Sequence, residues 1–449
     1  MWLIFRQYMT FDDLNLNKPL LNALHDLQFT TPTTIQQKAF SVVMSGRDVC
    51  AIAQTGTGKT VAYLLPCLRQ WAFSKDRFPQ ILVMVPTREL VVQVVEAVQK
   101  LTAYMSFAVA GFYGGTNMNP QMEVAAGKLD MVVATPGRLV DIVLSGALKL
   151  KNIKKLVIDE VDEMLNLGFR AQLKNILDLL PPKRQNLLFS ATITPEVQAL
   201  ADEFFNSPAV IEAAPVGTPV ANISQSLYHV PNFNTKVNLL ELLFREQADM
   251  SRVLVFVSTK QLADELYERL EADMPGKVGL IHSNKEQNYR FNSVRNFQNG
   301  TFRLLIATDI IARGLDVAEV THVLNFDMPE QPESYIHRIG RTGRLDKKGN
   351  AISFVTPAET AQLASIQQLM QYTVPVTPLP ENLAISAVLT KAEMPETVVP
   401  NIVLKQPKRE SGAAFHEKKE KNKKVNVRVS HKEKMMQKYG KPKSRGKKR

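Results

Sequence analysis

"DVCAIAQTGTGKTVAYLLPCL", from Asp48 to Leu68, is the most informative stretch of the chain. A short apolar run ends in a glycine-rich loop, and a segment with helical spacing begins directly after it. Gly56 and Gly58 let backbone N–H groups turn inward around an anion, and the N-terminus of the following helix adds its dipole. The stretch therefore predicts a strand, a phosphate-binding loop and a helix, in that order.

Short apolar runs that end at a polar cluster recur along the whole chain. "QILVMV" ends at "PTREL", "KKLVI" at "DEVD" and "QNLLF" at "SAT", and after residue 221 the pattern returns with "RVLVFV" and "RLLIA". Segments with helical spacing, such as "ELVVQVVEAVQKL", lie between these runs. Uniformly apolar strands that alternate with helices indicate parallel sheets covered on both faces. Ligands bind at the carboxyl ends of such strands, where all the polar clusters fall.

A length of 449 residues predicts two domains with additional segments. We predict a first α/β domain over 1–213, a linker over 214–221, a second α/β domain over 222–372, and a C-terminal extension over 373–449. From Lys405 onward, 18 Lys and Arg stand against four Asp and Glu, a net charge of +14, whereas the whole chain carries +12. We expect this tail to be disordered and to suit a phosphate backbone, although a merely solubilising tail is an open alternative.

Several protein classes are excluded by the composition. No apolar run reaches the roughly 18 residues that a membrane span needs. The first residues lack a secretory cleavage site, and the organised pattern begins at Met9, a candidate start. Cys50 and Cys67 give neither a disulfide framework nor a zinc spacing. We therefore predict a reduced, cytoplasmic protein.

The loop and a downstream acidic strand end together predict an ATP site. Lys59 is suited to the β- and γ-phosphates and Thr60 to Mg²⁺. Such a site needs a second strand that ends in acids, and "LVIDE" supplies it. Asp159 is the candidate magnesium acid, partly through water, and Glu160 is the candidate group that orients or deprotonates the attacking water. A solvated turn is the alternative, but it leaves the upstream loop unexplained.

With these motifs, the chain resembles the DEAD-box RNA helicases of superfamily 2 from about Phe11 to Gln371, with DEVD in place of DEAD. The resemblance implies two tandem RecA-like domains, ATP and Mg²⁺ as cofactors, and RNA-stimulated ATP hydrolysis that locally unwinds or remodels RNA duplexes and RNA–protein complexes. "GGTNMNPQM", "PPKRQNLLFSAT" and the basic tail are similar to the bacterial RhlE-type subgroup. We expect a monomer that does not bind membranes, with ribosomal or RNA-decay complexes as candidate partners.

The resemblance also assigns nucleotide-binding residues. "FTTPTTIQ" resembles the adenine-reading motif, with Gln36 pairing to the adenine edge and Phe11 stacking on the ring, although Gln28 and Thr34 depart from the usual glycine and proline. "HRIGRTGR" implies two arginine fingers on the γ-phosphate, which arginines of this kind stabilise by factors of about 10³–10⁵ in GTPases. The remaining implied contacts and the two fingers are Gln54, Thr55, Gly56, Thr57, Gly58, Lys59, Thr60, Gly314, Asp316, Arg341 and Arg344.

RNA-binding and coupling residues follow from the other motifs. Backbone contacts dominate the implied RNA set, so we expect little sequence preference. That set is Arg88, Gly115, Thr135, Arg138, Gln287, Arg290, Thr308 and Arg313. The residues implied to couple hydrolysis to strand separation are Asp162, Ser190, Thr192 and His337. Val161 stands where the family name expects alanine, and we expect its extra methyl groups to require only a packing adjustment.

Two other functions are left open by the sequence. One is an RNA chaperone or clamp whose annealing activity lies in the tail and for which ATP is only a switch. The intact set of candidate catalytic residues argues against it. The other is a DNA helicase of the same superfamily, against which Gln36 and "HRIGRTGR" argue.

Overall fold

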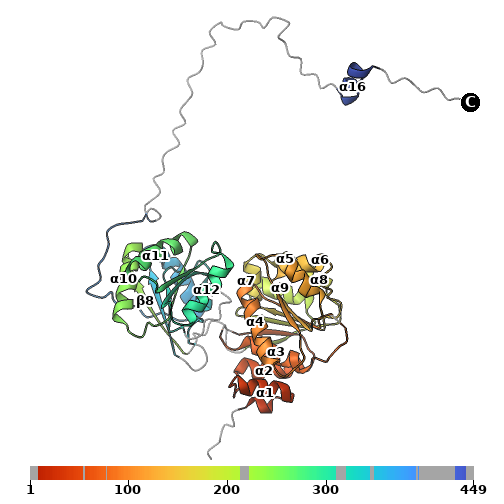
Figure 1. Cartoon of the computed structure of the whole chain (residues 1–449). Helices are drawn as coiled ribbons and strands as arrows, with labels where there is room; N and C mark the ends of the chain where they lie inside the picture. Colours follow the sequence, from red (N-terminus) through yellow and green to blue (C-terminus); the bar gives the residue numbers. More distant parts are fainter. Residues whose placement is uncertain are drawn as a thin grey trace, which may run out of the picture. The chain divides into compact units, whose positions relative to one another are not determined.

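Two parallel β-sheets, each packed between helices, form the body of the protein (Figure 1). The computed structural model describes residues 9–53, 56–76, 78–212, 222–309, 320–343, 348–390, 393 and 430–440. The predicted α/β class with two parallel sheets is confirmed. The predicted linker over 214–221 lies outside the described residues.

The first sheet has the strand order β3-β4-β2-β5-β6-β1-β7, and every neighbouring pair is parallel. Its strands are β1 (Val49–Ile52), β2 (Ile81–Met84), β3 (Val109–Phe112), β4 (Met131–Ala134), β5 (Lys155–Asp159), β6 (Gln185–Ser190) and β7 (Ala209–Glu212). The accompanying helices are η1 (Phe11–Asp13), α1 (Lys18–Asp26), α2 (Thr34–Met44), α3 (Lys59–Arg69), α4 (Arg88–Leu101), α5 (Met118–Ala126), α6 (Pro136–Leu144), α7 (Val161–Asn166), α8 (Arg170–Leu179) and α9 (Pro195–Phe204).

Successive residues of each strand point to opposite faces of the sheet, so the uniformly apolar strands build two separate cores. Val49 and Ala51 of β1 pack in a cluster with α1–α4, whereas Cys50 packs in a cluster with α5–α9. Val161 is fully buried in the second of these clusters. The packing adjustment expected at Val161 stays a prediction, and it concerns a closed core.

The second sheet has the order β10-β11-β9-β12-β13-β8 and is also parallel throughout. Its strands are β8 (Ile223–His229), β9 (Val253–Val257), β10 (Val278–Ile281), β11 (Leu304–Thr308), β12 (His322–Asn325) and β13 (Gly349–Val355). The helices are α10 (Phe233–Glu246), α11 (Lys260–Asp273), α12 (Gln287–Gln298), α14 (Pro332–Ile339), η2 (Pro357–Glu359) and α15 (Thr360–Met370). One face packs on α10 and α11 and the other on α12, α14 and α15.

Residues 374–390, here called the strap, contact the edge of the second sheet and the helix α10. Leu227 of the edge strand β8 exchanges backbone hydrogen bonds with Pro375 and Thr377, at 3.0 and 2.8 Å. Side-chain amides of α10 and its N-cap donate to three strap carbonyls at 2.6–2.8 Å, and these amides belong to Asn232, Asn234 and Asn238. The strap thus covers a strand edge that would otherwise present unpaired backbone groups.

The described part of the basic tail, residues 430–440, forms a helix that its composition does not predict, α16 (His431–Tyr439), drawn in blue in Figure 1. Ser430 accepts a hydrogen bond from the Glu433 N–H at 3.3 Å, and Glu433 accepts one from the Ser430 N–H at 3.1 Å. This reciprocal pair is a capping box, which satisfies two backbone donors at a helix start. Local capping therefore supports a helix here without a packed core.

No helix in the described parts of the chain combines the length and the apolar character needed to cross a membrane.

Candidate active site

The candidate site lies at the carboxyl ends of three neighbouring strands, β5, β6 and β1. The register pairs Asp159 with Phe189 and Ile52 with Ser190, so the acids after β5, the Ser-Ala-Thr segment after β6 and the loop after β1 begin at one edge. Parallel pairing aligns the ends of these strands. The fold thereby brings together the segments that the sequence predicted for an ATP site.

The phosphate-binding loop ends in a buried cation. Gly56 and Gly58 have φ of 83° and 84°, a left-handed conformation that strongly favours glycine. Lys59, the first residue of α3, is only 6% exposed, and its Nζ has no hydrogen-bond partner among the described residues. Leaving such a group unpaired is costly, so the position fits an anionic ligand such as the phosphates of ATP. Thr57 and Thr60 flank it, both partly exposed.

Asp159 and Glu160 differ sharply in environment. Burial raises the pKa of Asp159 to about 6, although nearby Lys59 lowers it, and neighbouring Glu160 raises it further. Glu160 is partly exposed and has φ 51° and ψ 49°, a conformation that is strained for a residue with a side chain. A buried carboxyl beside a buried ammonium, followed by a strained and accessible carboxylate, is the arrangement expected of one metal-binding and one water-activating acid.

Gln36 joins the predicted adenine motif to the loop. Its Oε1 accepts from the Thr33 N–H at 2.9 Å, and its Nε2 donates to the Gly58 carbonyl at 3.2 Å. A carboxamide has a second N–H and a second lone pair, and the predicted pairing of these groups with adenine stays a prediction. Phe11 is 5% exposed and packs in the core beside α1 and α2, and its predicted stacking on adenine stays a prediction. Gln28 has a left-handed backbone conformation with φ 58°. Glycine, which is usual at this position in the family, adopts this conformation without strain.

Asp162 is the last residue of "DEVD" (Asp159–Asp162), here called the acidic segment. It contacts residues of two other predicted coupling motifs, Thr192 after β6 and His337 in α14. Its Oδ2 accepts from the N–H and hydroxyl of Thr192 at 3.1 and 2.9 Å, and it lies 3.7 Å from His337 Nε2. Ser190 Oγ donates to the Thr192 carbonyl at 2.6 Å. Burial raises the pKa of Asp162, but His337, Lys59 and the hydroxyls outweigh it, so the pKa is lowered. The structure therefore brings all four predicted coupling residues together.

Arg88 and Arg138 occupy the predicted RNA surface of the first half. Arg88 lies so close to Gly115 that a Cβ there would stand 2.2 Å from its guanidinium, and Gly115 has φ 77°. Arg138 is 8% exposed and donates to the Thr116 carbonyl at 2.9 Å. Thr135 precedes α6 and is also buried. A backbone carbonyl thus holds the Arg138 guanidinium in place, and Arg88 lies against the backbone at Gly115.

Gln287 and Arg290 of α12 contact residues of the "PTREL" segment. Gln287 Oε1 accepts from Arg88 Nη1 at 3.0 Å and from Arg290 Nη1 at 3.1 Å. Glu89, which is 5% exposed, accepts from Gln287 Nε2 at 3.2 Å and forms an ion pair with Arg290. Three predicted RNA-binding residues are therefore bonded to one another. Glu89 was not predicted, and its only sequence signal is an acid inside a basic, phosphate-binding motif.

The motif "HRIGRTGR" (His337–Arg344), here called the arginine segment, follows β12 of the second sheet. Arg338 anchors this segment, and the sequence analysis assigned it no role. Arg338 is 1% exposed and forms a two-pronged ion pair with Asp309, at 2.5 and 2.7 Å. Asp309 directly follows Thr308 at the end of β11. Arg341, one turn further along, is 4% exposed, and its Nε donates to the His337 carbonyl at 3.3 Å. The predicted site residues outside the described parts of the chain are Gln54, Thr55, Arg313, Gly314, Asp316 and Arg344.

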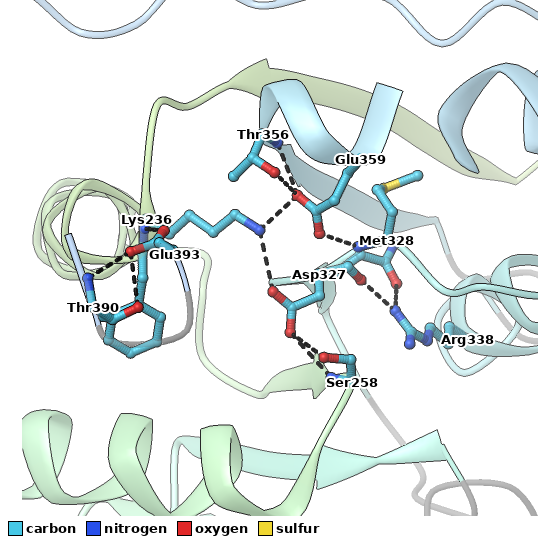
Figure 2. A network of polar contacts seen from close by, with 11 residues as sticks. Lys236, Ser258, Asp327, Met328, Arg338, Thr356, Glu359, Thr390 and Glu393 are labelled. Carbon is cyan, nitrogen blue, oxygen red and sulfur yellow. Dashed lines mark hydrogen bonds and ion pairs between the residues drawn. The ribbon is translucent and has the colours of Figure 1, made fainter. Parts of the chain in front are cut away.

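Figure 2 shows a largely buried network that connects the loop after β12 to Arg338. Lys236 Nζ donates to Asp327 Oδ1 at 3.2 Å and to Glu359 Oε2 at 2.8 Å. The other oxygen of Asp327 accepts from the N–H and hydroxyl of Ser258 at 3.0 and 3.1 Å, and its carbonyl accepts from Arg338 at 2.6 Å. Asp327 thus connects α10, the strand end at "FVSTK" and the arginine segment.

Comparisons with known proteins agree with this geometry. The family model described as DEAD/DEAH box helicase matches residues 33–200, and the model of the helicase conserved C-terminal domain matches residues 235–346. The RNA helicase CrhR of Synechocystis is 39% identical over 378 residues, which cover 84% of this chain and 76% of that protein. The DEAD-box ATP-dependent RNA helicase CshA of Bacillus subtilis is 38% identical over 363 residues, covering 80% of this chain and 72% of CshA.

Solved structures give the same result. S. cerevisiae Dbp5 bound to RNA and ADP BeF3 matches with a TM-score of 0.76 and 30% identity, over 82% of this chain and 96% of that one. Mss116p bound to ssRNA and AMP-PNP matches with a TM-score of 0.76 and 27% identity, over 84% of this chain and 80% of that one.

Proposed function

This chain belongs to the DEAD-box family of ATP-dependent RNA helicases, and from that membership we propose a division of labour among its residues. Its fold, two tandem RecA-like domains, and its activity, ATP-driven unwinding or remodelling of RNA, are those of the family. We propose domain limits of 1–213 and 222–372 with a linker over 214–221, and an extension over 373–449. The strap contacts extend the packed part of the second domain beyond residue 372.

In the proposed ATP site, the loop from Gln54 to Thr60 cradles the phosphates and Lys59 neutralises them. The single observation that carries this proposal is the buried Lys59 ammonium without a hydrogen-bond partner among the described residues, at the start of α3. Mg²⁺ supplies charge that stabilises the transferring phosphoryl group, and Thr60 and Asp159 are the residues that fit it. Glu160 orients and deprotonates the attacking water.

The second half completes the site. Arg341 and Arg344 supply positive charge to the γ-phosphate, and Gly314 and Asp316 contact the nucleotide. Asp162 and His337, 3.7 Å apart, form a path by which the acidic segment senses the arginine segment. Because the loop and the arginines belong to different sheets, full catalysis requires both, and RNA bound across them favours that state.

RNA binding uses the basic residues of both halves, together with Thr135, Gln287 and Thr308, and mainly contacts the backbone. The ion pair between Glu89 and Arg290 must yield part of its bonding when a phosphate enters. We further propose the RhlE-type subgroup, in which DEVD replaces DEAD without a change in chemistry, a cytoplasmic monomer, and ribosomal or RNA-decay complexes as partners.

Single-stranded RNA is expected to raise steady-state ATP turnover by at least about tenfold, whereas DNA of the same sequence leaves it within about twofold, because 2′-hydroxyl contacts distinguish the two. ATP hydrolysis is measured with each nucleic acid over a range of concentrations. Lys59→Ala is the control, because any ATP hydrolysis that remains in this variant comes from a source other than the proposed ATP site. Stimulation by DNA alone would contradict the RNA helicase assignment and favour a DNA helicase.

Gly115→Ala is expected to weaken RNA binding by about tenfold and to reduce the salt dependence by about one phosphate contact, because the new methyl group displaces Arg88. The left-handed φ adds local strain. RNA affinity is measured by fluorescence anisotropy at several salt concentrations. Gly114→Ala is the matched control, because a Cβ there meets no atom within 4 Å. Equal RNA affinities for the two variants would show that Arg88 does not contribute to RNA binding.

A further inference from the structure

Tyr63 is a buried hydroxyl-bearing residue beside the candidate ATP site that the roles above leave unused. It lies on α3, three residues after Thr60 and four after Lys59, and therefore on the same side of the helix as both. Its side chain is completely buried, and its ring packs edge-on against Phe189 with centroids 5.3 Å apart. Phe189 pairs in register with Asp159. The ring is thus fixed directly beside the magnesium acid.

Side-chain packing alone does not explain why the residue at position 63 carries a hydroxyl group. It is buried, and it makes no well-formed hydrogen bond to any residue in the described parts of the chain. The Asp159 carboxyl and the Thr60 hydroxyl, both proposed to act on Mg²⁺, lie close enough to interact with it. Burying a hydroxyl without a hydrogen bond is destabilising, and phenylalanine would keep the ring contact without that cost. The oxygen therefore needs a role beyond packing.

A tyrosine phenol has an ordinary pKa of about 10, so it carries its proton at neutral pH. A protonated phenol is a hydrogen-bond donor. The acceptors within its reach are the Asp159 carboxyl and the Thr60 hydroxyl and, once a magnesium ion binds, the water between Asp159 and that ion. A bound Mg²⁺·nucleotide can therefore supply the well-formed hydrogen bond that the hydroxyl does not make with the described residues.

We propose that Tyr63 is a positioning residue for the magnesium ion of bound nucleotide, and that its hydroxyl donates to the Asp159 carboxylate or to the water which that carboxylate shares with the ion. The proposal rests on the proposed function of Asp159 as the magnesium acid. It concerns the ion and not the phosphates, which Lys59 and the loop contact. Tyr63 should therefore affect nucleotide affinity only when Mg²⁺ is present.

The test is Tyr63→Phe in the full chain, with the dissociation constant of a fluorescent ADP analogue measured in Mg²⁺ and in EDTA. We expect the constant in Mg²⁺ to rise by about 3- to 10-fold, which is the loss of one charge-assisted hydrogen bond, while the constant in EDTA stays within about twofold. The Mg²⁺ concentration for half-maximal binding should rise in parallel. The ratio of the two constants cancels any general loss of folded protein.

Two further variants make the result decisive. Tyr335→Phe removes a buried hydroxyl that donates to Gln225 at 3.0 Å in the second half, and it should leave the Mg²⁺ ratio unchanged. Asp159→Asn should remove most of the Mg²⁺ dependence, and adding Tyr63→Phe to it should change nothing more. If Asp159→Asn keeps the dependence, the proposed role of Asp159 fails. If Asp159→Asn loses it but Tyr63→Phe keeps the normal ratio, the role of Tyr63 alone is overturned.

Discussion

Glu160→Gln is expected to lower RNA-stimulated ATP turnover by at least about 10²–10⁴-fold while ATP and RNA bind with nearly unchanged affinity. The amide keeps the size of the side chain and the left-handed conformation of the residue, but it cannot accept a proton from water. Glu160 is also the more accessible of the two adjacent acids, whereas Asp159 is buried and close to Lys59. The measurements are steady-state ATP hydrolysis and nucleotide and RNA binding by fluorescence.

Glu163→Gln is the matched control for this prediction. Glu163 lies in α7, three residues after Glu160, which is the N-cap residue of that helix, and it carries the same side chain. Its replacement should leave turnover within a few-fold of normal, and a melting curve for each variant excludes unfolding as the cause of any loss. Normal turnover in Glu160→Gln would show that another group activates the water.

The sequence predicted the parts of the site that depend on strand ends. An apolar run followed by a glycine-rich loop or by acids can only place those polar groups at the carboxyl edge of a parallel sheet. The loop before Lys59, the acids after β5 and the segment after β6 therefore lie together as expected. Their chemical roles stay predictions, because contacts with nucleotide and RNA are made by the residues only once those ligands bind.

Contacts between segments distant in sequence were not predictable in the same way. Glu89 and Arg290 are about 200 positions apart, and nothing in either local pattern specifies the other. The strap is similar, since a proline-punctuated segment has no periodicity that would show which surface it covers. Tyr63 lies within an ordinary apolar helix pattern, so its hydroxyl becomes notable only when its burial beside Asp159 is known.

Lys236→Met is expected to destabilise the second half by about 3–5 kcal/mol, because it leaves two largely buried carboxylates without their shared cation. Lys236 is 3% exposed, and Asp327 and Glu359 both accept from its ammonium, as Figure 2 shows. In a domain of this size the loss corresponds to a fall in melting temperature of about 10 °C or more. The measurement is thermal and urea unfolding of the full chain.

The matched control is Lys174→Met, whose ammonium pairs with Glu203 at 2.7 Å but is 56% exposed. Water screens that pair, so its removal should leave the melting temperature almost unchanged. Adding Glu359→Gln to Lys236→Met should recover part of the stability, because one of the two uncompensated charges disappears. An equal effect of Lys236→Met and Lys174→Met would mean that the buried network contributes nothing to stability.

The pH dependence gives an independent check on the same network. Burial raises the pKa of Glu359, but the Lys236 ammonium and the hydrogen bonds from Thr356 outweigh it, so the pKa lies below its ordinary value of 4.5. A lowered carboxyl pKa contributes stability above the unfolded pKa, and this contribution is lost as the pH falls through the folded pKa. The penalty of Lys236→Met should therefore be largest near neutral pH and should shrink as the pH falls through the acidic range in which Glu359 takes up a proton. A penalty that stays constant from neutral pH to pH 4 would assign the effect to lost packing of the Lys236 side chain and not to its charge.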